Sequence, residues 1–442
     1  MTQGYSPVAR ASALAIFHAA IAAVDPTQLV ADHLSCLNLE PVPGPAEPLL
    51  VIGAGKAAAR MAAGCERALG AGGVHGEVIV ADGCAVPLRS VIASPARHPL
   101  PDGRGEEATR RILDLISRPP AGAVLCLFSG GASSLLVCPR APVTLADKIA
   151  TTQLLLNCGA DIQAVNIVRK HLSEAKGGGL LRRARTSMLA LLLSDVVGDD
   201  PATIASGPTA PDPTTFADAW EVLRRYALET RAPASVVRLL QAGMAGEVPE
   251  TVKPGSPEEA RCRNLIIGRN RTALAGAARF ARAQGWRVVT EDAPLQGDTT
   301  LAAHSFGERI RRLAADHSGN TPLCVLAGGE TTVRVCGTGR GGRNQEFALA
   351  LAGMLAGTST TVLSAATDGV DGPTDAAGAF VDGTTLRRAH AEGVDVDAAL
   401  LENDSYTVFA RLGDLLRFGP TGTNVMDIKI ALLPACDRGP AL

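Results

Sequence analysis

The sequence VIGAGKAA at residues 51–58 decides the fold class of this 442-residue chain. It ends an apolar run, turns at two glycines and enters an amphipathic segment, matching the pattern GxGxxA through Gly53, Gly55 and Ala58. Glycines at this spacing let a strand turn sharply into a helix and let a ligand approach the backbone. The stretch therefore predicts a strand–turn–helix unit and matches a dinucleotide-binding fingerprint.

Lys56 makes this turn unusual for a dinucleotide site, although Asp82 after the next strand could serve as the acidic partner of such a site. An ammonium group at a helix N-terminus adds charge to backbone N–H groups that already favour an anion. Lys56 therefore favours a polyphosphate or a charged transition state. A tight structural turn with an exposed lysine stays open, whereas the chain has no GxxxxGK[ST] motif and so no Walker A site.

Short apolar runs alternate with amphipathic segments along the rest of the chain. Such alternation predicts βαβ units and an α/β fold with mostly parallel sheets. We expect helices at residues 56–69, 106–117, 272–284 and 344–355. Strands are expected at residues 49–52, 77–80, 124–128, 188–193, 265–267, 288–290, 323–326, 361–365 and 427–432.

Residues 246–259 contain three prolines and two glycines and are the best linker candidate. We therefore predict an N-terminal domain over residues 1–245 and a C-terminal domain over residues 260–442.

Charge and composition exclude several function classes. The chain has 42 basic and 44 acidic side chains, a net charge of −2 and 3% aromatic residues. Nucleic-acid binders and membrane-surface proteins carry basic runs or stacking aromatics, so neither partner is expected.

The cysteines and histidines indicate neither disulfides nor a zinc site. None of the ten cysteines forms a CxxC pair, and the eight histidines show no HExxH spacing. Free thiols predict a reducing compartment, and we expect the cytoplasm. The apolar residues 11–24 after Arg10 resemble a secretion signal, but an amphipathic helix ending at Asp25-Pro26 is the favoured interpretation.

Only six of the 42 basic residues are lysines, at positions 56, 148, 170, 176, 253 and 429. In a chain that uses arginine so freely, a lysine indicates a weak preference for a compact ammonium group. Lys176 precedes three glycines, and this predicts a helix end whose dipole favours the cation. A substrate or phosphate role for Lys176 is the second interpretation.

Four further loops follow predicted strands, where ligands of open α/β sheets bind. Residues 129–134, SGGASS, can form a nest of backbone amides and hydroxyls for a carboxylate or phosphate, with a capped tight turn as the alternative. Asp195 is the acid nearest the end of the strand expected at residues 188–193, and it can bind Mg²⁺ or accept a proton from a hydroxyl, with an acidic surface turn as the alternative.

The remaining two loops lie in the C-terminal half. Gly329 and Glu330 follow a strand, a glycine-rich loop ends at Arg343 and Asn344, and an acidic loop starts near Asp368. Guanidinium groups bind phosphate oxygens in a bidentate way, and carboxylates bind hard divalent cations. Cations combined with carboxylates are what phosphoryl transfer requires.

In this order, the loops resemble those of the glycerate 2-kinase family (class II glycerate kinases), whose C-terminal part is the MOFRL domain. The resemblance spans almost the whole chain. It rests on GAGKAA at 53–58, SGGASSL at 129–135, LSDVVGDDPATIASGPT at 193–209, GGRNQEFAL at 341–349, TDGVDGPTDAAG at 367–378 and GTNVMD at 422–427.

The resemblance implies two α/β domains, the first Rossmann-like with a mostly parallel sheet and the second a MOFRL-type domain with a mixed sheet. It implies in-line transfer from ATP with Mg²⁺ to D-glycerate in the inter-domain cleft, giving 2-phosphoglycerate. The family's catalytic lysine and arginine fall on Lys56 and Arg343, and its active-site aspartate falls on Asp195. Asp195 and Asp368 are the expected metal ligands. The predicted cofactor-binding residues are Gly53, Gly55, Ser129, Gly130, Gly131, Ser133, Gly329, Glu330 and Asn344.

Two other functions stay open from the residues alone. An NAD(P)H-dependent hydroxypyruvate reductase would use the GxGxxA turn but leaves the arginine loop without a role. A non-catalytic sugar-phosphate-binding module would need no acids at two strand ends. The oligomeric state is expected to be a monomer or a homodimer.

Overall fold

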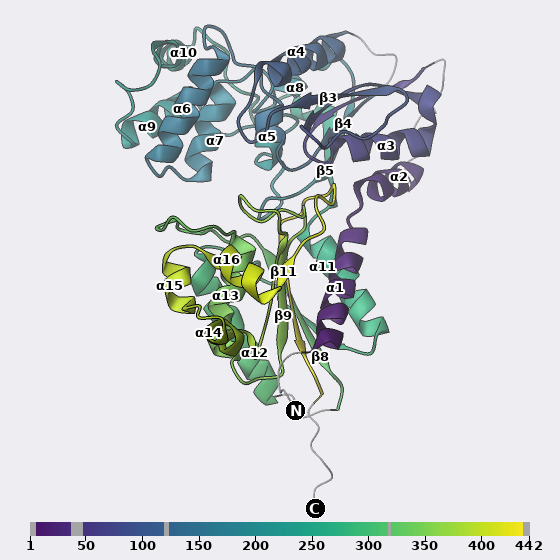
Figure 1. The fold of residues 1–442 in the computed structure, drawn as a ribbon. Coiled ribbons are helices and arrows are strands. Elements are labelled where there is room, and N and C mark those ends of the chain that lie inside the picture. Colours follow the sequence, from purple (N-terminus) through teal and green to yellow (C-terminus); the bar gives the residue numbers. More distant parts are fainter. Residues whose placement is uncertain (1–5, 37–46, 119–122, 317–319, 436–442) are drawn as a thin grey trace, which may run out of the picture. The chain divides into compact units, whose positions relative to one another are not determined.

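The computed structural model describes residues 6–36, 47–118, 123–316 and 320–435. The chain divides into two compact units (Figure 1). We call Pro26–Gly268 the middle unit, and the residues up to Asp25 together with those from Arg269 onward the terminal unit. The N-terminal segment therefore belongs to the same unit as the C-terminal half.

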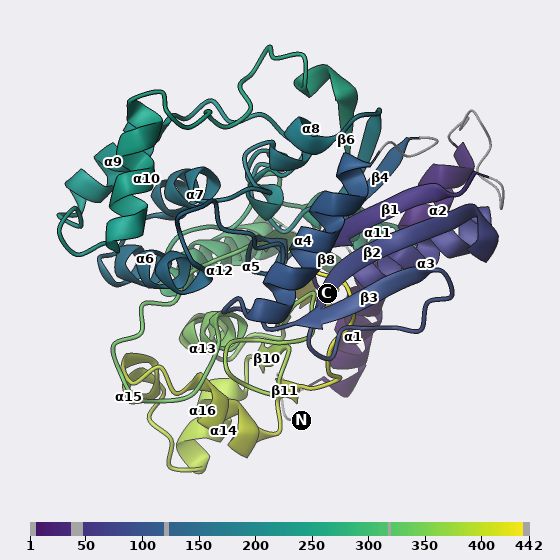
Figure 2. The same ribbon diagram turned by 90° about the horizontal axis from the view of Figure 1, so that it is seen from above.

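The middle unit contains a six-stranded sheet in the order β3-β2-β1-β4-β5-β6, and every pair is parallel (Figure 2). This confirms the predicted Rossmann-like parallel sheet. The direction of strand succession reverses between β1 and β4, which makes that point the expected ligand site. The strands are β1 (Leu49–Ala54), β2 (Val74–Ala81), β3 (Val91–Ala96), β4 (Val124–Phe128), β5 (Met188–Leu193) and β6 (Cys262–Gly268).

Buried apolar side chains pack around the sheet and between the helices of the middle unit. Every residue of β1 and β4 is buried, as expected for central strands of a parallel sheet covered on both faces. A second core around Phe216 joins α6, α7, α9 and α10 into a helical layer. The helices are α2 (Pro26–Cys36), α3 (Ala58–Leu69), α4 (Gly103–Ser117), α5 (Ala132–Leu135), α6 (Leu145–Asn157), α7 (Ile162–His171), α8 (Gly179–Arg183), α9 (Phe216–Arg225) and α10 (Ala234–Met244).

The terminal unit contains a mixed sheet in the order β11-β10-β9-β12-β8-β7, as the resemblance implied. Only β7 and β8 pair in parallel, and the other pairs are antiparallel. The strands are β7 (Arg287–Thr290), β8 (Leu323–Gly329), β9 (Thr361–Ala366), β10 (Gly378–Asp382), β11 (Leu415–Leu416) and β12 (Asp427–Leu433).

Helices cover both faces of this sheet, with α1 and α11 on one side and α12, α13 and the short helices α14–α16 on the other (Figure 1). The helices are α1 (Pro7–Ala22), α11 (Asn270–Ala283), α12 (Thr299–Asp316), α13 (Arg343–Leu355), α14 (Thr385–Ala391), α15 (Val396–Leu401) and α16 (Ser405–Leu412).

The predicted N-terminal helix is confirmed as α1, which buries Ile16 and Phe17 in the terminal unit. It packs so closely on α11 that a Cβ atom at Gly276 would lie 2.3 Å from the Cβ of Ala23. Within the described ranges, no single helix is long and apolar enough to cross a membrane. The pair α1 and α2 reaches that length only with a bend of 42°.

The division into units differs from the predicted domains 1–245 and 260–442. The proline-containing residues 246–259 lie within the middle unit, where Val252 donates a backbone hydrogen bond to Gly177 O at 3.1 Å and accepts one from Asp212 N at 2.7 Å. The chain then enters β6, which pairs with β5 in the same sheet. The change of unit comes after β6, at Arg269.

Candidate active site

The first two predicted loops meet beyond the carboxyl ends of β1 and β4. Lys56 N donates to Gly130 O at 2.8 Å, and Ala57 N donates to the Ser129 hydroxyl at 3.0 Å. This is the point where the strand order reverses, and open α/β sheets bind ligands there. The structure therefore brings Lys56 and the 129–134 loop to one place.

Close packing explains the glycines of these loops. A Cβ atom at Gly53 would lie 2.1 Å from Leu127 O, and one at Gly55, whose φ is +137°, would lie 2.1 Å from the Ser129 hydroxyl. The strands and the turn thus need these glycines whether or not a ligand binds. Contacts from them to a cofactor stay predictions.

The Lys56 side chain runs beside the second loop. Its Cγ lies 3.3 Å from the position that a Cβ of Gly131 would occupy. In the same loop, the Ser133 hydroxyl lies 3.0 Å from the Ser206 hydroxyl, and Ser206 donates to Asn166 Oδ1 at 3.2 Å. Asn166 was missed from the sequence, because it lies inside α7 and follows no strand.

Asp195 is the second residue after β5, the strand next to β4 in the sheet, and it is partly exposed. Ser194 N donates to Gly268 O at 2.9 Å and continues the pairing of β5 with β6. Asp195 is therefore the first residue past the paired strand, at the edge where the Lys56 loop also lies.

Arg343 begins α13 in the terminal unit and is held by two carboxylates. Its Nε and Nη2 donate to Asp427 Oδ2 and Oδ1 at 2.7 and 2.9 Å, and its Nη1 lies 2.6 Å from Glu330 Oε1. Burial alone would lower the pKa of Arg343, but the Asp427 and Glu330 charges outweigh it and raise that pKa. The two-point contact with Asp427 fixes the plane of the guanidinium group.

Asp427 is fully buried and belongs to a wider polar network. Lys429 Nζ lies 3.5 Å from Asp427 Oδ2 and also donates to the side chain of Asn344. Burial opposes ionisation of Asp427, yet the charges of Lys429 and Arg343 together lower its pKa. Asp427 thus stays ionised beneath the guanidinium group of Arg343.

Asn344, a predicted cofactor contact, is fully buried and bonded within the unit. Its backbone N–H donates to Asp371 Oδ1 at 3.0 Å, and its Oδ1 accepts from Ser364 Oγ at 3.0 Å. Asp371 also accepts from Gln345 N at 2.9 Å and so caps the N-terminus of α13. Sequence reasoning missed Asp371 as a partner of Asn344 and Asp427 as a partner of Arg343, because each carboxylate lies many residues further along the chain and reaches its partner only through the fold.

The glycine-rich residues 337–342 lie against the corner between α15 and α16. A Cβ at Gly337 would lie 2.3 Å from Glu402 Cα, and one at Gly341 would lie 2.3 Å from Ser405 Oγ. These glycines therefore permit close packing of the loop. Arg340 within it lies over the Tyr406 ring, 4.3 Å from the ring centroid, and Arg343 follows the loop as the first residue of α13.

Gly329 is the last residue of β8 and Glu330 follows it, while Asp368 follows β9 in the same sheet. Gly329 has a φ of +134°, and its Cβ would lie 2.3 Å from Leu295 O. Asp368 is partly exposed and accepts a hydrogen bond from Val370 N at 3.1 Å.

No group of three His, Cys, Asp or Glu side chains that could hold a metal occurs in the part of the chain that the structure describes. Mg²⁺ binds through one or two carboxylates when substrate phosphates and water supply the other ligands. The separate carboxylates of Asp195 and Asp368 fit that mode and do not fit a dedicated protein cage.

The comparisons with known proteins agree with these observations. The MOFRL family model matches residues 323–427, and a domain of unknown function (DUF4147) matches residues 12–241. Glycerate 2-kinase of Pyrococcus horikoshii is 38% identical over 386 residues, which are 87% of each chain. The crystal structure of glycerate kinase from Thermotoga maritima superimposes with a TM-score of 0.86 at 37% identity, over 97% of this chain and 100% of that one.

The chain belongs to the glycerate kinase family. A protein of Agrobacterium vitis with the name putative hydroxypyruvate reductase is also similar, with 40% identity over 95% of this chain and 93% of its own. Members of similar sequence therefore carry two different names.

In this member of the glycerate kinase family, Lys176 does not lie at the end of a helix, as the sequence predicted. Helix α7 ends at His171, and Gly177 and Gly178 precede α8 instead of ending a helix. The prediction of a dipole-stabilised lysine in a last helical turn is wrong, because the chain leaves α7 before it reaches the glycines. Lys176 is 1% exposed and lies inside the middle unit.

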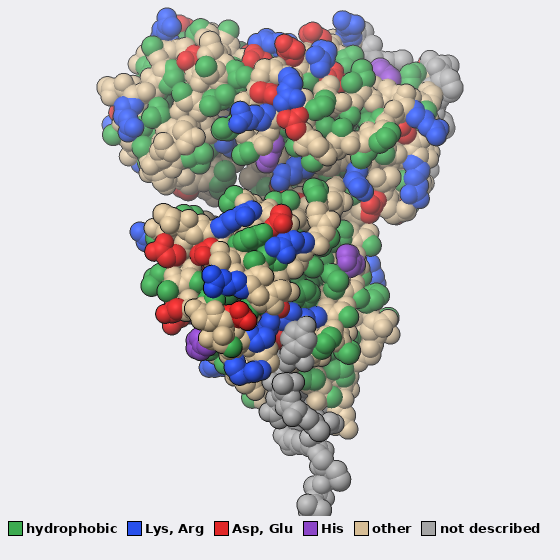
Figure 3. All heavy atoms as spheres, in the orientation of Figure 1, with side chains coloured by type: hydrophobic (Ala, Val, Ile, Leu, Met, Phe, Trp, Pro, Cys, Tyr) green, Lys and Arg blue, Asp and Glu red, His purple; other side chains and the backbone are tan. Residues whose placement is uncertain are grey.

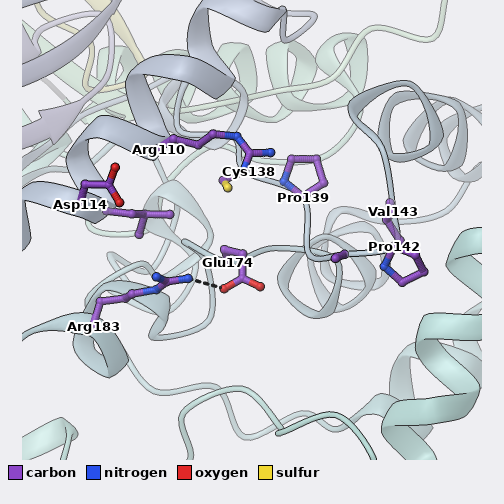
Figure 4. A pocket seen from close by; sticks show the side chains of 10 residues that line it. Arg110, Asp114, Cys138, Pro139, Pro142, Val143, Glu174 and Arg183 are labelled. Atoms are coloured by element: carbon purple, nitrogen blue, oxygen red, sulfur yellow. Dashed lines mark hydrogen bonds and ion pairs between the residues drawn. The ribbon is translucent and has the colours of Figure 1, made fainter. Parts of the chain in front are cut away.

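A surface hollow of about 500 Å³ also lies on the middle unit (Figure 4). Arg183 and Glu174 in its wall form an ion pair at 2.9 Å, and Arg110 and Cys138 lie beside them. None of the predicted site residues lines it, so the hollow is separate from the candidate site. On the face drawn in Figure 3, basic and acidic side chains are intermingled on both units.

Proposed function

We propose that this chain is an ATP- and Mg²⁺-dependent kinase that phosphorylates the C2 hydroxyl of D-glycerate to give 2-phosphoglycerate. The relatives named as glycerate kinases support the reaction class. The observation that carries the proposal is a pair of cations on well-packed elements. Lys56 lies where the strand order of the parallel sheet reverses, and Arg343 is held by two hydrogen bonds to Asp427.

The proposed chemistry is a direct in-line transfer. The C2 hydroxyl oxygen of glycerate forms a bond to the γ-phosphorus of ATP, the bond from that phosphorus to the β,γ-bridging oxygen breaks, and ADP leaves. Asp195 takes the hydroxyl proton. Lys56 and Arg343 stabilise the charge on the transferred group, which is the main requirement of phosphoryl transfer. One cation comes from each unit, in keeping with the inter-domain cleft that the resemblance implies.

The hydroxyls near Lys56 support direct transfer over a covalent intermediate. Ser129 accepts from Ala57 N at 3.0 Å, and Ser133 and Ser206 bond to each other. A serine nucleophile needs an adjacent base. Among the described residues, these three hydroxyls bond to an amide, to each other or to Asn166, and not to a histidine.

Magnesium and ATP belong to the same proposal. A bound Mg²⁺ would neutralise charge on the β- and γ-phosphates, and Asp195 and Asp368 would contribute its carboxylate ligands. Removal of the metal with EDTA should abolish turnover, and Mg²⁺ or Mn²⁺ should restore it.

A hydroxypyruvate reductase is the second candidate, since the relative from Agrobacterium vitis bears that name and the strand order also suits a dinucleotide. It gives no role to Arg343 and its carboxylates. A purified sample should release ADP from ATP only when D-glycerate and Mg²⁺ are present, and it should not oxidise NADH or NADPH with hydroxypyruvate. Reduced-nucleotide oxidation without ADP release would reverse the order of the candidates.

A further inference from the structure

Four of the six lysines are buried, which is rare for a side chain that normally stays in water. Two of them have a buried carboxylate partner. Lys170 Nζ lies 3.3 Å from Asp212 Oδ1, and Lys429 Nζ lies 3.5 Å from Asp427 Oδ2. Lys148 and Lys176 have no carboxylate at ion-pair distance anywhere in the described ranges, although they are 5% and 1% exposed.

Lys176 has little to compensate its charge. Its Nζ donates one long hydrogen bond, of 3.4 Å, to Ala205 O. A buried ammonium without an anion costs far more than one hydrogen bond returns. Burial, together with the nearby positive charges of Lys148 and Arg169, places the pKa of Lys176 well below its ordinary value.

Lys148 and Arg169 extend the positive region. Lys148 Nζ lies 3.4 Å from Arg169 O and from Leu172 O, at the C-terminal end of α7, where the helix dipole favours a cation. These contacts compensate part of the cost of burying the Lys148 charge. Arg169 is partly exposed and, like Lys148, has no carboxylate at ion-pair distance within the described residues.

A row of neutral polar groups connects these cations with the loop beside Lys56. Asn166 stands three residues before Arg169 and therefore on the same face of α7. Asn166 Oδ1 accepts a hydrogen bond from the Ser206 hydroxyl, which is also hydrogen-bonded to the Ser133 hydroxyl. Ser206 directly follows Ala205, the residue that Lys176 contacts. Donors and cations therefore converge within the middle unit alone.

We propose that Arg169, Lys176 and Ser133 form a subsite for a small organic carboxylate, namely that of the 2-hydroxy-acid acceptor. The inference rests on the proposed kinase function and specifies where the acceptor binds. A single carboxylate supplies the negative charge that the three cations lack. Lys176, Asn166 and Ser206 are at least nine-tenths buried, whereas Arg169 and Ser133 are partly exposed, so the proposed ligand is a compact anion that approaches from the side of Arg169 and Ser133.

Stability gives a first test. Lys176→Met removes an uncompensated buried cation, so its melting temperature should equal or exceed that of the wild type. Lys170→Met is the matched control, since it leaves Asp212 buried without its partner and should lower the melting temperature. A Lys176→Met protein that melts as far below the wild type as Lys170→Met would assign Lys176 a structural role and overturn the proposal.

Kinetics give the second test, with Arg169→Ala, Lys176→Met and the exposed helical control Arg224→Ala. Loss of one charged contact should raise KM for D-glycerate about 10- to 100-fold. KM for ATP should change less than about 2-fold, and Arg224→Ala should match the wild type. A rise in KM for ATP with an unchanged KM for glycerate would assign the cations to a phosphate and overturn the proposal.

Calorimetry without ATP separates this inference from the kinase assignment. D-Glycerate, lactate, tartronate and inorganic phosphate are titrated near pH 8 in two buffers of different ionisation enthalpy. A carboxylate should bind with proton uptake, because its charge favours the protonated form of Lys176. The uptake should fall in Lys176→Met. Binding of a hydroxy-acid other than glycerate, lost in Arg169→Ala, would support the subsite and reject the glycerate assignment. No carboxylate binding by the wild type would overturn the subsite.

Discussion

At the scale of single residues, Lys56 is the side chain on which the proposed chemistry depends most. Lys56→Ala should lower kcat about 10²- to 10³-fold, the scale for loss of one preorganised transition-state donor. Lys56→Arg should rescue poorly, because a planar guanidinium group cannot replace a compact ammonium group in a tight glycine turn. Steady-state kinetics with thermal melts as the folding control measure this. A kcat near that of the wild type would remove Lys56 from the mechanism.

Asp427 should act through Arg343 and not on the substrate. Asp427→Asn keeps the shape but loses the charge of the bidentate partner, so kcat should fall about 10- to 100-fold. In the background of Arg343→Ala, the same change should cost little more, because there is no guanidinium group left to orient. The kcat values of the four proteins give the coupling. If the kcat losses of the two single variants multiply in the double variant, Asp427 acts independently of Arg343.

Sequence reasoning found the side chains that point out of loops and missed those that hold them. Lys56 and Arg343 stand beside glycines, and glycine-rich loops are visible without a structure. Asp427 contacts Arg343 only because β12 pairs with β8 and β9, and the local sequence around either residue does not reveal that pairing. The burial of Lys176 could not be predicted either, since it depends on where α7 ends and on the contact of Lys176 with the backbone of Ala205.

At the scale of elements, strands with long apolar runs were predictable and short or interrupted strands were not. Strands β4 and β5 match their predicted bounds, since both are continuous apolar runs. Strand β3 was missed because it contains Pro95 and is half exposed at the sheet edge, which is where proline is tolerated. Strand β11 has two residues, too few for a pattern of its own, and the five residues of β10 include Gly378 and Asp382, which are types depleted in strands.

Arg10, whose side chain is mostly buried, joins helix α1 to the rest of the terminal unit through two ion pairs. Arg10 donates to Asp382 Oδ2 at 2.6 Å and to Asp414, and both carboxylates are at most 1% exposed. Arg10→Leu should lower the free energy of unfolding by about 3 kcal/mol, because two buried carboxylates lose a partner. Urea denaturation measures the loss, with the exposed Arg279→Leu on α11 as control. A loss below about 1 kcal/mol would show that Arg388 alone compensates both carboxylates.

At the scale of the whole molecule, the buried lysines should make stability depend on pH. Burial, with the charge of Arg169 nearby, lowers the pKa of Lys148 to about 7. The unfolded chain keeps the ordinary value near about 10.4, so it binds more protons than the folded chain between these two pH values. The free energy of unfolding should therefore rise with pH from about 7 to about 10.

Lys148→Met isolates this contribution. Its unfolding free energy, measured in urea at about pH 7, 8 and 9, should rise less with pH than that of the wild type, because Lys148 no longer titrates and because Lys176 loses a neighbouring charge that lowers its pKa. Parallel curves for the two proteins would mean that Lys148 is not held neutral by burial.

The central claim is that the enzyme forms a phosphate ester at C2 of glycerate, and the phosphorus spectrum of the product tests it most directly. After incubation with ATP, Mg²⁺ and D-glycerate, the proton-coupled ³¹P signal should be a doublet, because the phosphorus of 2-phosphoglycerate couples to a single methine proton. The signal should grow in step with ADP. A triplet from the methylene protons of 3-phosphoglycerate, or no new ester while glycerate and ATP persist, would contradict the account.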